Sequence, residues 1–473
     1  MGPRLFGSQR ADFERMRRCF SAAALFVTLA VCQAQTRMMM TTVVPSTYFN
    51  DQTPYGELTL GNDGYLYGTT YTGGAFGKGS YFKTTLDGAI TFVAFDGTNG
   101  TMPFRAPLQA ADGNFYGAAT AGGAMDAGTV YQIDTNGAMH VVYSFDGTNG
   151  SEPGSLVLAR NGDLYGFTFN GGIGFDGTPS SGDGVIFKLT TNGDFTRLAS
   201  FTETNLYPKN IIDAGGGILY GTTESGGDYG FGTVFRMNPD GQLVTLVSFD
   251  GTNGVCPTSL IMGSDGLLYG TTALGGNGFT GNKNGGGSVF KVSTNGSFTT
   301  LRFFSGNDGN WPWGQLIEVT NGLFYGVTYM GGKNGEGTVF QITSGGQFAS
   351  ILQCDARWER GGLPRTGLTK GSDGNYYGIT SAPFYEVNCL RPVEAPVLQY
   401  KLENGQITLS WKVLGGLWYW LSYKTNLDEP VWHPTGTMPT DTETNGIQSH
   451  TEPIDPSAPR FYKVSINIPE HWW

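Results

Sequence analysis

The sequence predicts an all-β fold: a seven-bladed β-propeller closed by an N-terminal strand, followed by a small C-terminal β-sandwich. Glycine accounts for 75 of the 473 residues and only 14% of the chain is charged, a composition that suits many short strands and tight turns. A phrase built on Tyr-Gly recurs seven times, at intervals of 49 to 56 residues. Asn-Gly or Asp-Gly pairs separate many of the strands that we expect within each unit.

The first 34 residues resemble a signal peptide. Arg15, Arg17 and Arg18 precede an almost wholly apolar run, Cys19–Cys32, and a small-x-small cleavage site ends at Ala34. This order is typical of secretory signals, and the run is too short to span a membrane comfortably. We therefore expect cleavage near Ala34 and a secreted or cell-surface protein, with the periplasm as the alternative. The export route, general or twin-arginine, stays open, and we expect no transmembrane anchor in the mature chain.

Residues 35–390 contain seven copies of one unit. Each unit has an apolar first strand, such as 155–159, then the Tyr-Gly strand, then strands such as 232–237 and 242–249. Turns such as Asn136-Gly137 predict type I′ hairpins, in which both central residues have positive φ. A four-stranded antiparallel sheet repeated in this way is a propeller blade. The repeated tyrosines, which we expect in the core, are Tyr67, Tyr116, Tyr165, Tyr220, Tyr269, Tyr325 and Tyr377.

The seventh unit ends after a third strand, predicted at 383–388, and lacks a fourth. A spare strand exists near the N-terminus, because residues 41–51 align with the fourth-strand segment 298–308. We therefore predict that the N-terminal strand completes the last blade. This closure removes the exposed sheet edges that would otherwise favour aggregation.

The pattern LYGTT-x-x-GG, followed by G-T-V-F-K and by a strand that ends in DGTNG, resembles the GloVer tandem-repeat proteins of bacterial secretomes. The resemblance covers roughly residues 38–390. It implies export and often a C-terminal surface anchor or sorting signal, and it implies no catalytic motif. The sequence ends in IPEHWW without an apolar helix, so we expect no membrane attachment here.

Residues 391–473 differ from the repeats. Three segments read as strands, at 406–413, 418–426 and 460–466. They resemble the small fibronectin-III-like sandwiches that close many exported bacterial proteins.

Composition limits the chemistry of the chain. A net charge of −11 argues against nucleic-acid binding, which needs a basic surface. The four histidines are scattered, and no familiar metal or nucleophile motif is present, so we expect no cofactor and no catalytic residue. The DGTNG loops, the first at 96–100, lack the spaced carboxylates of a calcium loop, and turn chemistry explains them better. The mature chain would keep Cys256, Cys354 and Cys389, for which we expect no disulfide.

Strand parity places the loops between the second and third strands on the same face as the connections between blades. These loops are long and variable in length, and ligands prefer variable loops on a rigid scaffold. We therefore expect a monomeric binding module for an extracellular carbohydrate or protein. The alternatives are a carbohydrate-active enzyme with its site at the channel mouth, a structural cell-surface component, or aromatic side chains that merely pack between loops. The expected contact residues are Phe175, Asp176, Asp228, Tyr229, Phe279, Lys283, Trp311 and Trp313.

Overall fold

The structure, a computed structural model, divides the chain into two compact units, one covering Arg37–Pro392 and the other containing the chain from Val393 onward. It describes residues 37–178, 180–201, 206–280, 284–355, 362–382, 384–393, 399–413, 418–425, 431, 433–435, 446–453 and 460–467. The expected signal peptide lies outside these residues. Within them, no helix has both the length and the apolar character needed to cross a membrane.

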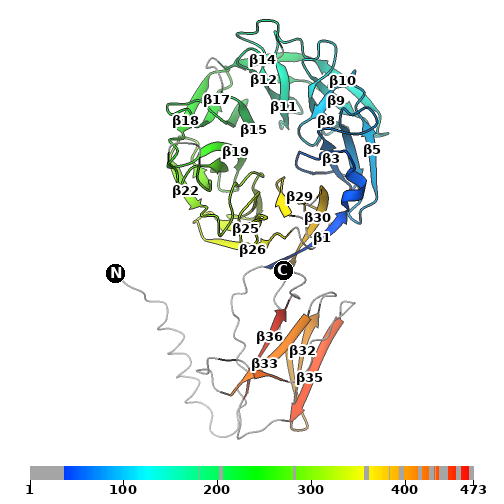
Figure 1. Cartoon of the computed structure of the whole chain (residues 1–473), viewed down its shortest axis with the longest axis vertical. Helices are drawn as coiled ribbons and strands as arrows, with labels where there is room; N and C mark the ends of the chain where they lie inside the picture. Colours follow the sequence, from blue (N-terminus) through cyan, green and yellow to red (C-terminus); the bar gives the residue numbers. More distant parts are fainter. Residues whose placement is uncertain are drawn as a thin grey trace. The chain divides into compact units, whose positions relative to one another are not determined.

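In the described part of Arg37–Pro392, seven antiparallel sheets follow one another around a ring (Figure 1). The first contains β2 (Thr59–Leu60), β3 (Leu66–Thr70), β4 (Ser80–Thr84) and β5 (Ile90–Ala94). The second contains β6 (Thr101–Pro103), β7 (Leu108–Gln109), β8 (Phe115–Ala121), β9 (Thr129–Ile133) and β10 (Met139–Ser144). The third contains β11 (Ser151–Leu158), β12 (Leu164–Asn170), β13 (Val185–Leu189) and β14 (Phe195–Ser200).

The next three sheets repeat this arrangement. The fourth contains β15 (Pro208–Gly215), β16 (Ile218–Thr223), β17 (Thr233–Met237) and β18 (Leu243–Ser248). The fifth contains β19 (Val255–Met262), β20 (Leu268–Leu274), β21 (Ser288–Val292) and β22 (Phe298–Phe303). The sixth contains β23 (Ile317–Thr320), β24 (Leu323–Thr328), β25 (Thr338–Thr343) and β26 (Phe348–Gln353).

The seventh sheet joins the two ends of this unit. It contains β27 (Gly362–Pro364), β28 (Thr369–Lys370), β29 (Tyr376–Ala382) and β30 (Glu386–Val393). β1 (Arg37–Val44) is hydrogen-bonded to β30 as its outer strand, which is the pairing that the sequence predicts (Figure 1). A short 3₁₀ helix, η1 (Ser46–Phe49), then leads into the first sheet.

The third strand of the seventh sheet lies later than predicted. β30 begins at Glu386 and ends at Val393, whereas we expected residues 383–388. Leu390 of this strand is 2% exposed and belongs to the core. The expected domain boundary at residue 390 therefore falls inside β30.

The hairpin turns also differ from the prediction. In the turn between β9 and β10, the N–H of Gly137 donates to the oxygen of Asp134 at 2.9 Å, and the N–H of Asp134 donates to the oxygen of Ala138 at 2.9 Å. Gly137 has a φ of +86°, whereas Asn136 is not among the residues with positive φ. This is a three-residue loop with a type I turn and a glycine bulge, so the type I′ prediction is wrong for this turn.

The repeated Tyr-Gly pair builds the core of each sheet. Tyr116 and Tyr269 are almost fully buried, and each hydroxyl donates to the aspartate four residues earlier, Asp112 or Asp265, at 2.7 Å. The glycine after the tyrosine makes room for a ring: a Cβ on Gly166 would lie 2.3 Å from Phe187, its partner on the next strand of the same sheet.

The C-terminal unit has two three-stranded antiparallel sheets in its described part. One contains β31 (Gln399–Glu403), β32 (Gln406–Val413) and β35 (Gly446–Pro453), and the other contains β33 (Trp418–Lys424), β34 (His433–Pro434) and β36 (Phe461–Asn467). The buried side chains include Leu409, Trp411 and Leu421. Between β31 and β32, Asn404 and Gly405 both have positive φ, as a type I′ turn requires.

Candidate ligand-binding site

The long loops between second and third strands lie beside the connections between sheets, as strand parity predicts. The N–H of Gly172 donates to the oxygen of Gly147 at 2.8 Å, and Gly276 makes the same bond to Gly251. The short hairpin turns lie at the opposite ends of the strands. We call the end of the sheets that carries these long loops the long-loop face.

In every sheet a residue followed by proline lies at or shortly before the start of the innermost strand, at the long-loop face. In six sheets the residue before the proline has a φ between +45° and +57°. These six residues are Met102, Glu152, Tyr207, Cys256, Trp311 and Leu363. This left-handed conformation is costly for residues other than glycine, and such strain concentrates at functional sites.

Aromatic rings gather at the long-loop ends of the first and second strands of several sheets. The ring centre of Tyr55 lies 4.8 Å from that of Phe104 and 5.9 Å from that of Tyr71. Phe104 in turn lies 6.0 Å from Phe169 at the end of β12. Rings from the first, second and third sheets are thus in contact. We call Tyr55, Tyr71, Phe104, Phe169, Trp311, Tyr329 and Tyr385 the inner aromatic cluster.

Arg365 extends the contact to the sixth and seventh sheets. Its guanidinium carbon lies 5.0 Å from the ring centre of Tyr55 and 5.9 Å from those of Tyr329 and Tyr385. Tyr329 also stacks on Trp311, with ring centres 6.3 Å apart and an interplanar angle of 10°. Cations over aromatic faces are attracted to them, which stabilises the guanidinium of Arg365 among these rings.

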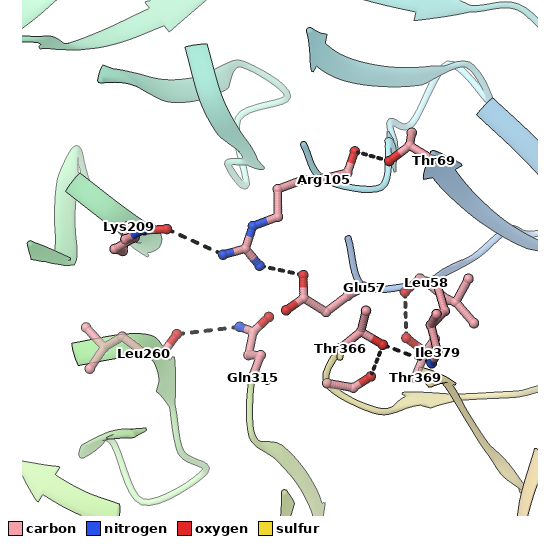
Figure 2. Close-up of polar contacts among 11 residues, drawn as sticks. Glu57, Leu58, Thr69, Arg105, Lys209, Leu260, Gln315, Thr366, Thr369 and Ile379 are labelled. Atoms are coloured by element: carbon pink, nitrogen blue, oxygen red, sulfur yellow. Dashed lines mark hydrogen bonds and ion pairs between the residues drawn. The ribbon is translucent and has the colours of Figure 1, made fainter. Parts of the chain in front are cut away.

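Polar side chains span the centre of the ring (Figure 2). Arg105 donates to the carboxylate of Glu57 in the neighbouring sheet and to the backbone oxygen of Lys209 at 3.5 Å. Gln315 donates to the backbone oxygen of Leu260 at 3.5 Å. Burial alone would raise the pKa of Glu57, but the charge and hydrogen bond of Arg105 hold that pKa below its usual range.

Four of the inner segments are one residue longer than the other three, and Glu57, Arg105 and Gln315 lie in three of these four. The residue opposite the repeated tyrosine lies five positions after the proline in the second sheet, at Leu108, but four positions after it in the third, at Val157. The first, sixth and seventh sheets share the longer spacing, and their inner strands are short or interrupted. β11, β15 and β19 of the other three sheets are continuous.

The close approach of neighbouring inner segments explains two glycines. A Cβ on Gly56 would lie 2.6 Å from the nitrogen of Ala106, and a Cβ on Gly314 would lie 2.5 Å from the nitrogen of Gly367. Only glycine permits such backbone contact. Two inner segments that carry members of the inner aromatic cluster, next to Tyr55 and near Trp311, are therefore in close backbone contact with their neighbours.

Two acidic groups lie near the cluster. Asn170 donates to the carboxylate of Glu152 at 2.9 Å, and burial raises the pKa of Glu152. Burial and the charge of Glu152 together raise the pKa of Tyr71. Glu224 forms an ion pair with Lys209 at 2.5 Å.

The model of the Gloeobacter/Verrucomicrobia repeat family matches residues 30–180 and 176–386. The chain belongs to this family. No curated protein sequence matches this Gloeobacter/Verrucomicrobia repeat protein.

Several solved structures are similar to the chain in fold. Puromycin hydrolase is 14% identical, with a TM-score of 0.48 over 77% of this chain and 58% of its own. The chain therefore spans less than two thirds of that protein. A putative 6-phosphogluconolactonase from Bacteroides fragilis is 13% identical, with a TM-score of 0.45 over 89% of this chain and 99% of its own. An ulvan lyase bound to -[GlcA(1-4)Rha3S]- is 11% identical, with a TM-score of 0.39 over 79% of this chain and 91% of its own. These likenesses are weak and concern the fold alone.

Of the residues predicted as contacts in this repeat protein, Trp311 alone joins the inner aromatic cluster by a ring contact. Trp313 follows Pro312, as Tyr55 and Phe104 follow their prolines, and it is 40% exposed. Lys283 lies outside the described residues.

The other predicted contact residues lie in the outer parts of the long loops. The half-buried rings of Phe175 and Phe279 cover Gly147 and Gly251, where a Cβ would lie 2.1 Å away, so they pack between loops. Asp176 accepts hydrogen bonds from the N–H and hydroxyl of Thr178, and bonds from Ser181 and Thr178 lower its pKa to about 2. Asp228 and Tyr229 are exposed, Tyr229 at 60%.

The sequence reasoning missed most of the cluster. Its signal is present in two positions of the repeat: the residue after the inner-strand proline, as in Tyr55 and Phe104, and the residue after Tyr-Gly-x-Thr, as in Tyr71 and Tyr329. In three of the seven units, Tyr or Phe occupies the second position, with Phe169 as the third example.

The DGTNG loops of this repeat protein use their own polar groups. Asp96 accepts hydrogen bonds from the N–H groups of Thr98 and Asn99 and from the Thr98 hydroxyl, at 2.7–3.2 Å. Asp250 is engaged in the same way by Thr252 and Asn253. Among the described residues, no group of three His, Cys, Asp or Glu side chains is placed to hold a metal ion.

Proposed function

We propose that the unit Arg37–Pro392 is a seven-bladed β-propeller and that the C-terminal unit is a fibronectin-III-like sandwich. Seven four- or five-stranded antiparallel sheets around a ring support the first assignment. Two three-stranded antiparallel sheets support the second assignment, and each sheet has buried apolar side chains, such as Leu409 in one and Leu421 in the other. Residues 1–34 are proposed as the export signal of a secreted or cell-surface protein.

The proposed function is carbohydrate binding by the inner aromatic cluster. The single observation that carries it is the contact between half-buried rings of the first three sheets, Phe169 with Phe104 and Phe104 with Tyr55, which Arg365 extends from Tyr55 to Tyr329. Ligand sites are lined by aromatic side chains with a few fixed polar groups, and a rigid scaffold holds them. Sugar rings offer flat C–H faces that pack against such aromatic rings, while Glu152 can accept hydrogen bonds from sugar hydroxyls.

Substitution at the cluster tests this function. The purified chain is screened on a glycan array, and the glycan bound is then titrated against Tyr55→Ala and Phe104→Ala. We expect each variant to weaken binding at least about fivefold, because truncating a central aromatic contact removes more than about 1 kcal/mol. Tyr229→Ala, in an outer loop, is the matched control and should bind normally. Loss of binding in Tyr229→Ala with normal binding in the other two would contradict the proposal.

A further inference from the structure

Three cations lie at the inner strand ends, and two of them are neutralised. Arg105 is paired with Glu57, and Lys209 is paired with Glu224. Arg365 differs, because no carboxylate among the described residues forms an ion pair with it. Within the described part of the chain, its charge faces the rings of Tyr55, Tyr329 and Tyr385.

This arrangement leaves the hydrogen-bonding edge of Arg365 uncommitted. A guanidinium carries five N–H donors in one plane, and contacts to ring faces use none of them. No described group accepts a hydrogen bond from the Arg365 side chain, although its backbone N–H donates to the oxygen of Ile379 at 2.9 Å. The Arg365 nitrogens are not among the buried side-chain atoms that lack a partner, so solvent reaches them and an oxyanion from outside the chain could replace that water.

We propose that Arg365 recognises an oxyanion on an acidic polysaccharide, either a uronate carboxylate or a sulfate ester. This rests on the proposed carbohydrate function. The planar fork of an arginine matches a carboxylate or sulfate with two parallel hydrogen bonds, and the rings on either side hold the fork in place. The net charge of −11 does not prevent this contact, since repulsion from distant charges is screened beyond about 8 Å at physiological salt.

Matched pairs of charged and neutral polysaccharides test the proposal. Affinity electrophoresis compares polygalacturonate with its methyl ester, alginate with its propylene glycol ester, and dextran sulfate with dextran. We expect the purified chain to bind the charged member of at least one pair about tenfold more tightly than the neutral member. The pair that shows the difference identifies carboxylate or sulfate.

Variants separate the two proposals. Arg365→Gln should remove the preference for the charged member and keep binding to the neutral one, and Arg365→Lys should restore part of the preference. Arg302→Gln is the matched control, because Arg302 in β22 also lies over a ring, that of Phe348 at 4.6 Å, but is paired with Asp308 in the connection between the fifth and sixth sheets. It should keep the preference.

Two outcomes overturn the inference about Arg365 alone. The first is equal binding of charged and neutral members by the unmodified chain, and the second is an unchanged preference in Arg365→Gln. In both cases Tyr55→Ala still loses binding to the charged and to the neutral member. Binding of no polysaccharide, or binding that Tyr55→Ala and Phe104→Ala leave intact, overturns the proposed function itself. Thermal melting of each variant shows whether a loss of binding reflects unfolding.

Discussion

At the scale of single residues, four of the seven repeats contain an aspartate and a hydrogen-bonded tyrosine four positions apart. Asp63, Asp112 and Asp373 accept hydrogen bonds from the hydroxyls of Tyr67, Tyr116 and Tyr377 at 2.7–2.8 Å. The same aspartates accept backbone N–H bonds within their turns. Each of these carboxylates thus stabilises its turn and accepts a hydrogen bond from a buried tyrosine hydroxyl. The turn is therefore coupled to the core of the sheet.

These carboxylates predict acid sensitivity. Burial alone would raise the pKa of Asp63, Asp112 and Asp373, but hydrogen bonds from tyrosine hydroxyls and turn N–H groups hold each pKa below its usual range. Their stabilisation is therefore present above the unfolded aspartate pKa of about 3.9 and is lost as pH falls through the lower, folded pKa. In urea unfolding at pH 2 to 7, stability should fall below about pH 4, more steeply than in a triple Asp→Asn variant. If the free energy of unfolding fell equally with pH in the unmodified protein and in the triple variant, this prediction would be contradicted.

The glycine bulge gives a second prediction at this scale. Gly137→Ala should lower the free energy of unfolding by about 1–2 kcal/mol, because an L-residue at this φ is strained. Its new methyl group would also lie 3.1 Å from the hydroxyl oxygen of Tyr81. Asn136→Ala should change stability by no more than about 0.5 kcal/mol, since Asn136 is exposed and lacks positive φ. Equal losses at both positions would indicate a two-residue turn.

At the scale of the strands, much of the architecture was predictable because its signals are local. Periodic Tyr-Gly strands and glycine turns predict the seven units, and the segment at 41–51 predicts the pairing of β1. The turn type was missed because type I′ turns and glycine bulges share the same Asn-Gly sequence. The inner aromatic cluster was missed for another reason: Tyr55, Tyr329 and Arg365 are distant in sequence, and they meet only when β1 and β30 pair.

The pairing of β1 is testable by deletion. Removing residues 35–50 should lower the melting temperature by at least about 10 °C or cause aggregation. The deletion exposes the edge of β30 and removes Met38, Met40 and Val44, which are at most 8% exposed. Removing residues 394–473 is the control, because no described strand beyond β30 joins the seven sheets. This control deletion should leave the melting of the ring unchanged; the reverse pattern would refute the role of β1.

At the scale of the whole molecule, apolar packing between sheets holds the ring together. Cys256, Cys354 and Cys389 are buried thiols, each in a different sheet region. Burial, with the nearby charges of Glu336 and Asp355, raises the pKa of the Cys354 thiol to about 12. These thiols therefore report on the integrity of the ring.

Thiol titration tests this. In protein expressed without residues 1–34, all three cysteines should react with a thiol reagent in denaturant and almost none should react in buffer. A cysteine reacts when it is exposed to solvent and in the thiolate form, and burial in the folded ring disfavours both. Only one reactive thiol in denaturant would reveal a disulfide and refute the topology.

The pairing of β1 with β30 also sets an order of events. The hydroxyl of Thr42 donates to the side-chain oxygen of Asn388 at 3.1 Å, which joins residues 346 positions apart. β1 is among the first segments of this unit to be synthesised, yet its partner is the last strand of the unit to be made. Contacts of such long range form slowly, because the loop between them must be closed first. The ring therefore closes only after synthesis of the seventh sheet, and every earlier species carries an open strand on which a second chain could add.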